Sequence, residues 1–423
     1  MGFAVKKIGF LPPLVLALVL FHRFTAVLSA LNYTNYSQVS SVRLERIQRH
    51  LDKINKPAAM IIESPDGDII DCVHKRKQPA LDHPLLKNHK IQREPPEMPR
   101  LKVLKDGEEL RPERTKKSKE AGGALGEPFP YGGARWDDVL RAKSLFDFGK
   151  KRRRSISLAR RRDAPDVVSG NGHEHAIAYT GLLEEVYGAK ATINVWDPTI
   201  QAVNEFSLSQ IWILSGSFNG PDLNSIEAGW QVSPELYGDS RPRLFTYWTS
   251  DSYQATGCYN LLCAGFVQTH SRIAIGASIS PLSSYTGNQY DISILIWKDP
   301  KLGNWWMSFG DGTLVGYWPA ELFTHLAKHA TMVEWGGEVV NSRADGKHTA
   351  TQMGSGHFAE DGFGKASYFR NLEIVDSDNS LSSARSISTM AENTNCYNIQ
   401  SSYSNEWGTH FYYGGPGSNP RCP

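Results

Sequence analysis

The sequence predicts an all-β fold, an antiparallel β-sandwich in residues 172–423, preceded by a small α+β unit and a disordered basic linker. Three observations lead to this class. From about Gly172 onward, apolar and polar residues alternate with a period of two, which is typical of half-buried strands. Gly- and Asn-rich turns separate the alternating runs. Ten of the eleven Trp lie in this part, which is long enough to bury a large core.

Charge divides the chain at the same place. Residues 1–171 carry 33 Lys and Arg against 20 Asp and Glu, whereas residues 172–423 carry 13 against 24. The net charge of +2 therefore conceals a basic part at +13 and an acidic part at −11. The acidic part repels phosphate, and the basic part has few aromatic residues to stack on bases, so we expect no nucleic-acid partner.

Residues 1–30 have the pattern of a secretory signal peptide. Two lysines precede a short apolar stretch, Ile8–Phe21, and small residues follow at Ser29–Ala30. The stretch is shorter than the roughly 20 residues that span a bilayer, so no stable membrane association is expected after cleavage. Asn32 and Asn35 begin N-glycosylation sequons. These features predict a glycoprotein secreted to the extracellular space or the cell wall, with the vacuole as an alternative.

Residues 31–92 have the pattern of a compact α+β unit. Apolar residues recur at helical spacing over 38–57, and Pro57 ends the run. Two short strands, Ala59–Ile62 and Asp68–Cys72, flank a Ser-Pro-Asp-Gly turn.

The following segment, residues 93–171, contains too few apolar side chains to form a core of its own. We therefore expect a flexible linker. Its basic run, Lys150–Arg154, is expected to be exposed and to serve as a processing site. A linker that is merely solvated is the alternative.

Within the sandwich, alternating runs predict strands at 206–213, 243–249, 272–279, 290–297, 305–309 and 314–318. The Gly310–Gly312 sequence is a hairpin signal between the last two. One helix is predicted at Ala320–His329, because Pro319 precedes it as a helix-starting residue.

The acidic part contains four cysteines, an even number that predicts disulfides in a secreted protein. Cys258 and Cys263 close a short loop and are expected to pair locally, which leaves Cys396 to pair with Cys422 near the C-terminus. A zinc site is the rival interpretation, but no Cys-x-x-Cys or paired His accompanies these residues, so we expect no metal and no cofactor. Cys72 is the odd cysteine.

Two isolated carboxylates in predicted strands are candidate catalytic groups. Glu227 shares a strand face with Gly229 and Gln231, and Glu338 follows two glycines that let a backbone or ligand approach closely. Spacing alone does not pair the two glutamates, and solvent-facing strand residues are the alternative.

Several segments together resemble the plant neprosin family of glutamic peptidases. Asp68–Cys72 and Gln78–Gln92 resemble the activation peptide of the family. The segments that resemble its C-terminal domain are 236–240, 245–248, 256–260, 265–268, 316–319, 335–339 and 352–356. The resemblance implies a β-sandwich in which Glu227 and Glu338 form the catalytic pair, while Glu334 lies outside the matching Trp-Gly-Gly-Glu.

The resemblance also implies an acid-acting endopeptidase that cleaves polypeptide substrates after proline. It is made as a pro-enzyme, with its own pro-segment in residues 31–92 as an intramolecular inhibitor. Two carboxyls in one cleft share a proton, so one activates water and the other polarises the scissile carbonyl. Trp230 and Trp335 are candidates for stacking on a proline ring, with a core position as the alternative.

Other interpretations remain open at this point. An aromatic-rich sandwich also suits a non-catalytic cell-wall or carbohydrate-binding protein, and paired carboxylates also serve glycosidases. His173 and His175 share a strand face where a metal could bridge them, although no third ligand is evident. The opposite charges of the two parts lead to a hypothesis in which His74, His83 and His89 gain charge in acid and release the pro-segment.

Overall fold

The structure is a computed structural model of the chain and describes residues 41–101, 129–142, 144–151, 172–182, 185–217, 220–343 and 347–423. The predicted signal peptide and both sequons lie outside these ranges, as do the three arginines of the basic run. No helix among the described residues is long and apolar enough to cross a membrane. The chain divides into two units, 1–52 and 53–423. Helix α2 (Ser41–Ile54), predicted from the spacing over 38–57, supplies the described residues of the first.

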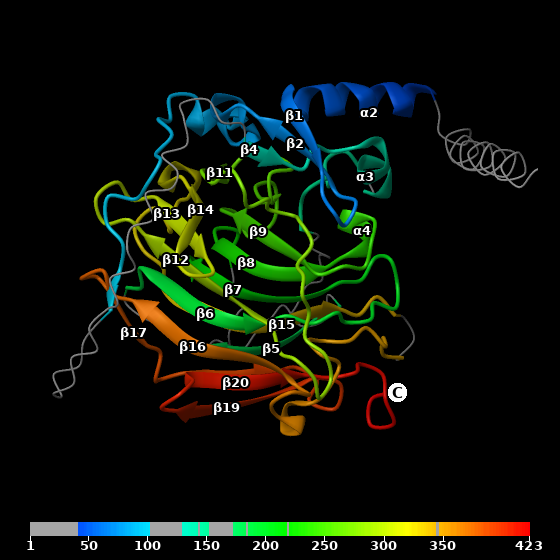
Figure 1. Cartoon of the computed structure of the whole chain (residues 1–423), viewed down its shortest axis with the longest axis vertical. Helices are drawn as coiled ribbons and strands as arrows, with labels where there is room; N and C mark the ends of the chain where they lie inside the picture. Colours follow the sequence, from blue (N-terminus) through cyan, green and yellow to red (C-terminus); the bar gives the residue numbers. More distant parts are fainter. Residues whose placement is uncertain are drawn as a thin grey trace, which may run out of the picture. The chain divides into compact units, whose positions relative to one another are not determined.

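Seven antiparallel strands form one sheet of the second unit, in the order β10-β9-β8-β7-β15-β5-β18. Their bounds are β5 (His173–Tyr179), β7 (Ser207–Ser215), β8 (Asn224–Val232), β9 (Arg243–Thr249), β10 (Cys258–Tyr259), β15 (Met332–Val340) and β18 (Ser388–Ala391). Alternating side chains and β-branched and aromatic residues favour these strands. Figure 1 shows β7, β8 and β9 running side by side.

Ten strands form the second sheet, in the order β11-β14-β13-β12-β6-β16-β17-β3, with β20 paired to β16 and β19 to β20. Their bounds are β3 (Arg100–Leu101), β6 (Gly188–Asn194), β11 (Val267–Gln268), β12 (Asp291–Lys298), β13 (Trp305–Phe309), β14 (Thr313–Trp318), β16 (Ser367–Val375), β17 (Ser380–Ser383), β19 (Asn398–Ser404) and β20 (Gly408–Gly414). Its pairs are antiparallel except for β17 with β3. β13 and β14 form the hairpin predicted at Gly310–Gly312.

The main core lies between these two sheets. It combines inward-facing side chains of β7 and β8, such as Ile211 and Trp230, with Ala191 and Ile193 of β6 and Ile294 of β12. Two packed β-sheets with one shared core confirm the all-β sandwich predicted from the alternation.

A small α+β unit precedes the sandwich. β1 (Ala58–Glu63), β2 (Ile69–Val73) and β4 (Phe129–Tyr131) form a three-stranded sheet. Short helical turns follow at η1 (Lys75–Lys77), η2 (Pro79–Asp82) and η3 (Pro84–Leu86), and α3 (Trp136–Arg141) follows β4. The prediction of a linker throughout 93–171 is therefore wrong for residues 129–142, which form β4 and α3.

The helix predicted at Ala320–His329 is also wrong. Only η4 (Ala320–Leu322) forms a helical turn, and Phe323 after it is extended. The buried amide oxygen of Asn224 accepts three backbone N–H groups, from Thr324, His325 and Leu326. Because this side chain satisfies the donors that helix bonds would have paired, the segment folds around Asn224. Two further short turns in the sandwich are α4 (Pro234–Tyr237) and η5 (Ala359–Asp361).

Residues 272–279, predicted as a strand, form a loop packed on β9. Gly276 has a φ of +94°, a conformation that favours glycine. Its N–H donates to the carbonyl of Leu244 at 2.8 Å, and Ala277 N–H donates to the Ala274 carbonyl. The tight turn at this glycine interrupts the extended backbone, although the alternation of apolar and polar residues in the sequence continues through it.

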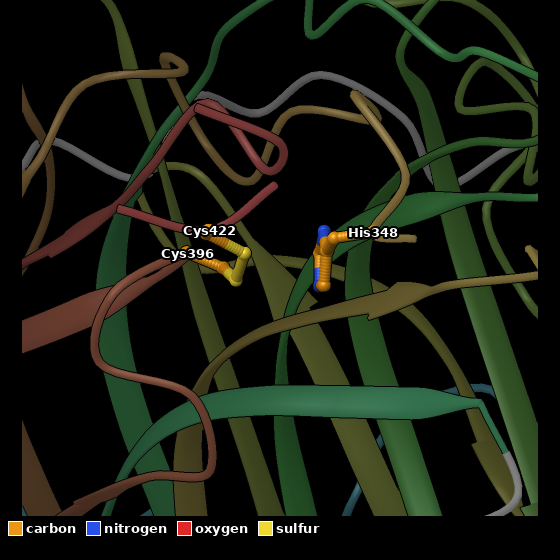
Figure 2. A group of neighbouring side chains, drawn as sticks. All are labelled: His348, Cys396 and Cys422. Carbon is orange, nitrogen blue, oxygen red and sulfur yellow. A yellow bond between two sulfur atoms is a disulfide. The ribbon is translucent and has the colours of Figure 1, made fainter. Parts of the chain in front are cut away.

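Both predicted disulfides are present. Cys258 is bonded to Cys263 and Cys396 to Cys422, whereas Cys72 is a buried free thiol. His348 lies beside the second disulfide (Figure 2), and this group has the composition of a metal site. The sulfur atoms are bonded to each other, however, and the two ring nitrogens of His348 contact Glu174 and the Thr349 carbonyl. The group thus offers no thiolate ligands.

Candidate active site

Glu227 and Glu338 converge on one face of the seven-stranded sheet. β8 carries Glu227, β15 carries Glu338, and β7 lies between them. In the register, Glu227 is opposite Trp212 of β7 and Glu338 is opposite Leu208. Trp212 and Leu208 belong to a second buried cluster, separate from the core between the sheets. Both glutamates are buried, at 0% and 1% exposure, so they are not the solvent-facing strand residues of the alternative interpretation.

One ammonium group bridges the two carboxylates. Lys151 Nζ lies 3.1 Å from Glu227 Oε2 and 2.8 Å from Glu338 Oε2. Burial opposes charge on Lys151, but the two carboxylates raise its pKa above the usual range. Burial likewise opposes ionisation of Glu338, yet Lys151 and His173 lower the pKa of Glu338 well below its usual range. The site is a buried triad of two carboxylates and one ammonium.

Neutral hydrogen-bond donors surround Glu227. Ser225 Oγ and Tyr253 OH donate to Oε1 at 2.9 and 2.7 Å, and Gln210 Nε2 donates to Oε2 at 3.0 Å. Gln210 occupies the middle of β7, opposite Gly229 on β8 and Gly336 on β15. Because neither neighbour carries a side chain, the strands approach closely at Gln210, where a Cβ on Gly229 would clash with the β7 backbone.

Imidazoles surround the other carboxylate. His173 Nδ1 lies 2.5 Å from Glu338 Oε1, and His175 Nε2 lies 3.9 Å from the same oxygen. His175 is the register partner of Glu338 on β5. The other ring nitrogen of His175 lies 3.2 Å from Glu392, which follows β18. The two imidazoles that were weighed as metal ligands thus contact the catalytic candidate itself.

Backbone contacts of the segment 144–151 with the sandwich hold Lys151 in place. The Gly149 carbonyl accepts from Tyr259 N–H at 2.8 Å, and Lys151 N–H donates to Tyr247 OH at 3.2 Å. Gly149 has a φ of +72°, and a side chain there would come within 3.1 Å of Cys263 Sγ, so glycine suits the position. Lys151 is therefore anchored in the sandwich. It is neither linker nor exposed, and both predictions are wrong for this residue.

The stacking role predicted for Trp230 and Trp335 is wrong as well. Both indoles are fully buried between the sheets, and Trp230 Nε1 donates to the Asn194 carbonyl of β6 at 2.8 Å. Side chains alternate along a strand, so each indole points to the face opposite its neighbouring glutamate. The aromatic rings beside the glutamates belong to Tyr247, Tyr253 and Tyr259.

Glu334 lies on the same face of β15 as Glu338 but in a different register row. It is opposite Trp212, the residue that Glu227 also faces from the other side. The Trp212 position therefore separates Glu334 from Glu227. The register thus puts Glu334 in the cross-strand row of Glu227, and its exclusion from the catalytic pair stays a prediction.

Sequence analysis missed Lys151, Gln210 and Tyr253. A lysine in a run of basic residues has the appearance of a solvated charge, and the available signal was the apolar group Leu145, Phe146 and Phe148 just before it. Phe148 is buried, as an anchored segment requires. Gln210 carried only the weak signal of a polar residue within an apolar strand.

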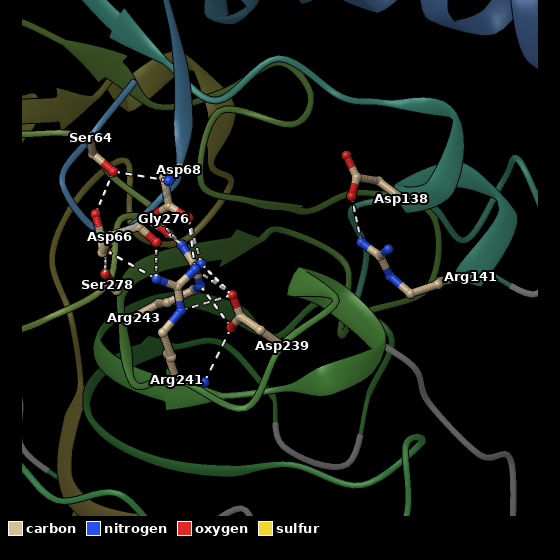
Figure 3. A network of polar contacts seen from close by, with 10 residues as sticks. All are labelled: Ser64, Asp66, Asp68, Asp138, Arg141, Asp239, Arg241, Arg243, Gly276 and Ser278. Atoms are coloured by element: carbon tan, nitrogen blue, oxygen red, sulfur yellow. Dashed lines mark hydrogen bonds and ion pairs between the residues drawn. The ribbon is translucent and has the colours of Figure 1, made fainter. Parts of the chain in front are cut away.

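A second ion-pair network joins the β1–β2 hairpin to the sandwich (Figure 3). Both carboxylate oxygens of Asp68 pair with Arg243, at 2.7 and 2.8 Å, and Asp68 also contacts Arg241 at 3.0 Å. Asp66 contacts Arg241 and Ser278, and Asp239 joins both arginines from the sandwich side. Burial disfavours the Asp68 anion, but Arg243 and Arg241 hold the pKa of Asp68 below its usual range.

The histidines of the α+β unit differ in their contacts with the sandwich. His83 meets Trp248 edge-on at 5.9 Å, and burial lowers the pKa of His83. His89 instead contacts Tyr317 OH at 2.8 Å and the Glu321 carboxylate at 3.3 Å. A proton on His83 would oppose docking, whereas a proton on His89 would add an ion pair.

Comparisons with known proteins agree with the sequence motifs. The model of the Neprosin family matches residues 203–416, and that of the Neprosin activation peptide matches residues 61–179. A scytalido-glutamic peptidase crystallised with a peptide-based transition-state analogue is 11% identical, with a TM-score of 0.32 over 58% of this chain and 98% of that one. SCP-B, a member of the eqolisin family of peptidases in a complex with the tripeptide Ala-Ile-His, is 11% identical, with a TM-score of 0.31 over 57% and 96%.

Proposed function

The chain belongs to the neprosin family of glutamic-type peptidases, and we propose that it is a secreted pro-enzyme that cleaves polypeptides after proline in acid. The observation that carries the proposal is the position of Lys151 Nζ, within 3.1 Å of one oxygen from each of two buried glutamates. A water molecule in the same place would lie within hydrogen-bond distance of both carboxyls. Residues 144–151, which lie beyond the 31–92 segment predicted as the inhibitor and belong with it to the pro-segment from here on, therefore fill the site of the attacking nucleophile.

Two carboxyls that face one water have a direct chemical use. Their charges repel at short range, so the pair holds one proton in acid. The ionised carboxylate takes a proton from water, and the resulting oxygen attacks the scissile carbonyl carbon. The protonated partner donates a hydrogen bond to the carbonyl oxygen, and a proton then passes to the leaving amine.

The pro-segment inhibits this chemistry by charge and by bulk. Lys151 lowers the pKa of Glu338 and so holds it as an anion, and its ammonium takes the place that the attacking water would need between the two carboxyls. Residues 144–151 also occupy the backbone donor Tyr259 N–H, which a bound peptide would use. Activation requires removal of Lys151, either by cleavage of the chain or by release of the segment.

Acid action follows from the shared proton, because a pair with two anions lacks its general acid. Specificity for proline is supported by the family resemblance and by the aromatic side of the site. Tyr247 and Tyr253 stack at 5.9 Å between centroids, and Lys151 Nζ lies 5.6 Å from the Tyr253 ring. A pyrrolidine ring at the position of the lysine side chain would contact these rings.

The test incubates the full chain at about pH 3 to 5, where a coupled carboxyl pair holds one proton. One substrate is a peptide with a single internal proline, and the other is a cell-wall polysaccharide. Cleavage on the carboxyl side of proline is expected, with a loss of about 10²- to 10⁴-fold in Glu227→Gln and Glu338→Gln. Glu334→Gln is the matched control and should retain activity.

The result that would overturn the proposal is an intact peptide after residues 144–151 have been removed by processing. Hydrolysis of the polysaccharide in place of the peptide would move the assignment to a glycosidase. Binding of the polysaccharide without hydrolysis of either substrate would make the sandwich a carbohydrate-binding module.

A further inference from the structure

Glu338 differs from Glu227 in the charges that face it. His173 and His175 of β5 face Glu338, and so does Lys151 of the pro-segment. The fourth charged group is Glu227 of β8, which shares Lys151 with Glu338. Glu392 lies behind His175, and Tyr259 is near enough for the Glu338 charge to contribute to raising the tyrosine pKa. Besides Lys151, a serine, a tyrosine and an amide donate hydrogen bonds to Glu227.

The two oxygens of Glu338 have separate partners. Oε1 is held by the imidazoles, whereas Oε2 is held by Lys151. Departure of Lys151 therefore frees Oε2 for water and leaves the contacts of Oε1 in place. Glu392 holds His175 in turn. Its Oε2 atom accepts from the backbone N–H of His175 at 2.6 Å and lies 3.2 Å from Nδ1 of the same residue.

We propose that His173 and His175, the latter braced by Glu392, are positioning residues that keep Glu338 ionised in acid as the general base. The proposal rests on the proposed function for its kinetic consequence. Glu227, among neutral donors, then keeps the shared proton and acts as the acid. The imidazoles touch neither substrate nor water in this scheme and act through Glu338.

Positive charge on the imidazoles favours the ionised form of Glu338. An imidazole beside a carboxylate is protonated in acid, and its positive charge favours the carboxylate anion. Burial disfavours charge on His175, but Glu392 and Glu338 raise the pKa of His175 to about 9. A charged imidazole therefore remains beside Glu338 after Lys151 leaves. Removal of that imidazole should shift the titration of Glu338 to higher pH.

The experiment titrates Glu338 directly in the full chain carrying Lys151→Met. Carbon-13 NMR of labelled glutamate carboxyls follows the titration, and Glu338→Gln identifies the resonance. His173→Asn keeps a side-chain N–H near the place of Nδ1 but removes the charge. In His173→Asn we expect the midpoint of the Glu338 titration to rise by about 1 to 3 pH units. The acid limb of kcat/KM for peptide hydrolysis should move by the same amount.

His325→Asn is the matched control, because His325 forms a surface pair with Asp222 at 2.8 Å. It should leave the Glu338 midpoint unchanged, and melting curves establish that each variant is folded. An unmoved midpoint in folded His173→Asn overturns the proposal, whatever the activity. A shifted midpoint in a chain that cleaves no peptide even after residues 144–151 have been removed supports the electrostatic role and refutes the proposed function, so the two failures are distinguishable.

Discussion

Replacement of Lys151 by methionine is the sharpest perturbation of the buried triad. Methionine keeps most of the apolar length of the side chain but removes the ammonium that lies 2.8 and 3.1 Å from the carboxylates. Breaking a buried ion pair in this way costs about 3 to 5 kcal/mol at neutral pH. At about 2 to 4 °C per kcal/mol for domains of 150–250 residues, the melting temperature should fall by roughly 6 to 20 °C, with the lower part of that range expected for this longer chain.

The difference in melting temperature between wild type and Lys151→Met should shrink as the pH falls. In the wild-type chain the pKa of Glu338 is depressed, so its stabilising contribution is present above the ordinary glutamate pKa of about 4.3. That contribution is lost as the pH falls toward the depressed value. In Lys151→Met the pair takes up a proton instead, which relieves the repulsion. The two melting temperatures should therefore converge below about pH 4.

Thermal unfolding followed by circular dichroism at about pH 7 and about pH 3 measures both effects. Lys150→Met is the matched control, because Lys150 Nζ donates to the exposed Ala255 carbonyl and lies over the Phe146 ring. Its effect should stay within about 0.5 kcal/mol. If Lys151→Met and Lys150→Met have the same melting temperature at both pH values, the triad is not the stabilising contact that its geometry indicates.

Three further predictions concern docking and stability. Asp68→Asn should weaken docking of the β1–β2 hairpin by about 2 to 4 kcal/mol, seen as faster limited proteolysis at neutral pH. Because the pKa of Asp68 is lowered, the difference from wild type should vanish as the pH falls below its ordinary range. Removal of the Cys396–Cys422 bond, which spans 26 positions, should cost about 3.5 kcal/mol in urea unfolding. His83→Gln should slow acid release of the pro-segment, whereas His89→Gln should hasten it because the contact of His89 with Glu321 is lost, and equal release rates in the two variants would contradict these opposite roles.

The strands show what sequence patterns can predict. Alternation in the run around Glu227 correctly separated the glutamate from Trp230 by face, because the period of a strand is a property of its backbone. The same alternation failed at Gly276, where one positive φ turns an extended run into a loop. The helix-start signal of Pro319 failed for another reason, because Asn224, whose side chain takes up the backbone donors of that segment, lies on a strand distant in sequence.

The pairing of the two glutamates was not available from spacing. Glu227 and Glu338 lie on strands that are not neighbours, and β7 between them comes earlier in the chain than either. Only the family motifs placed them together, and their role in catalysis stays a prediction. Lys151 was missed for a physical reason. Its burial depends on two carboxylates supplied by other segments, and no local pattern records such a partner.

The contacts between the pro-segment and the sandwich do not follow the charge of the two parts. The basic part contributes an acidic residue, Asp68, to two arginines of the acidic part. Lys151 does follow the overall polarity. Attraction between net charges of +13 and −11 acts at long range and is screened by salt, whereas these pairs are partly or wholly buried. Acid therefore acts on the docked pro-segment through individual carboxyls: protonation of Asp68 weakens the hairpin contact, and protonation within the glutamate pair weakens the hold on Lys151.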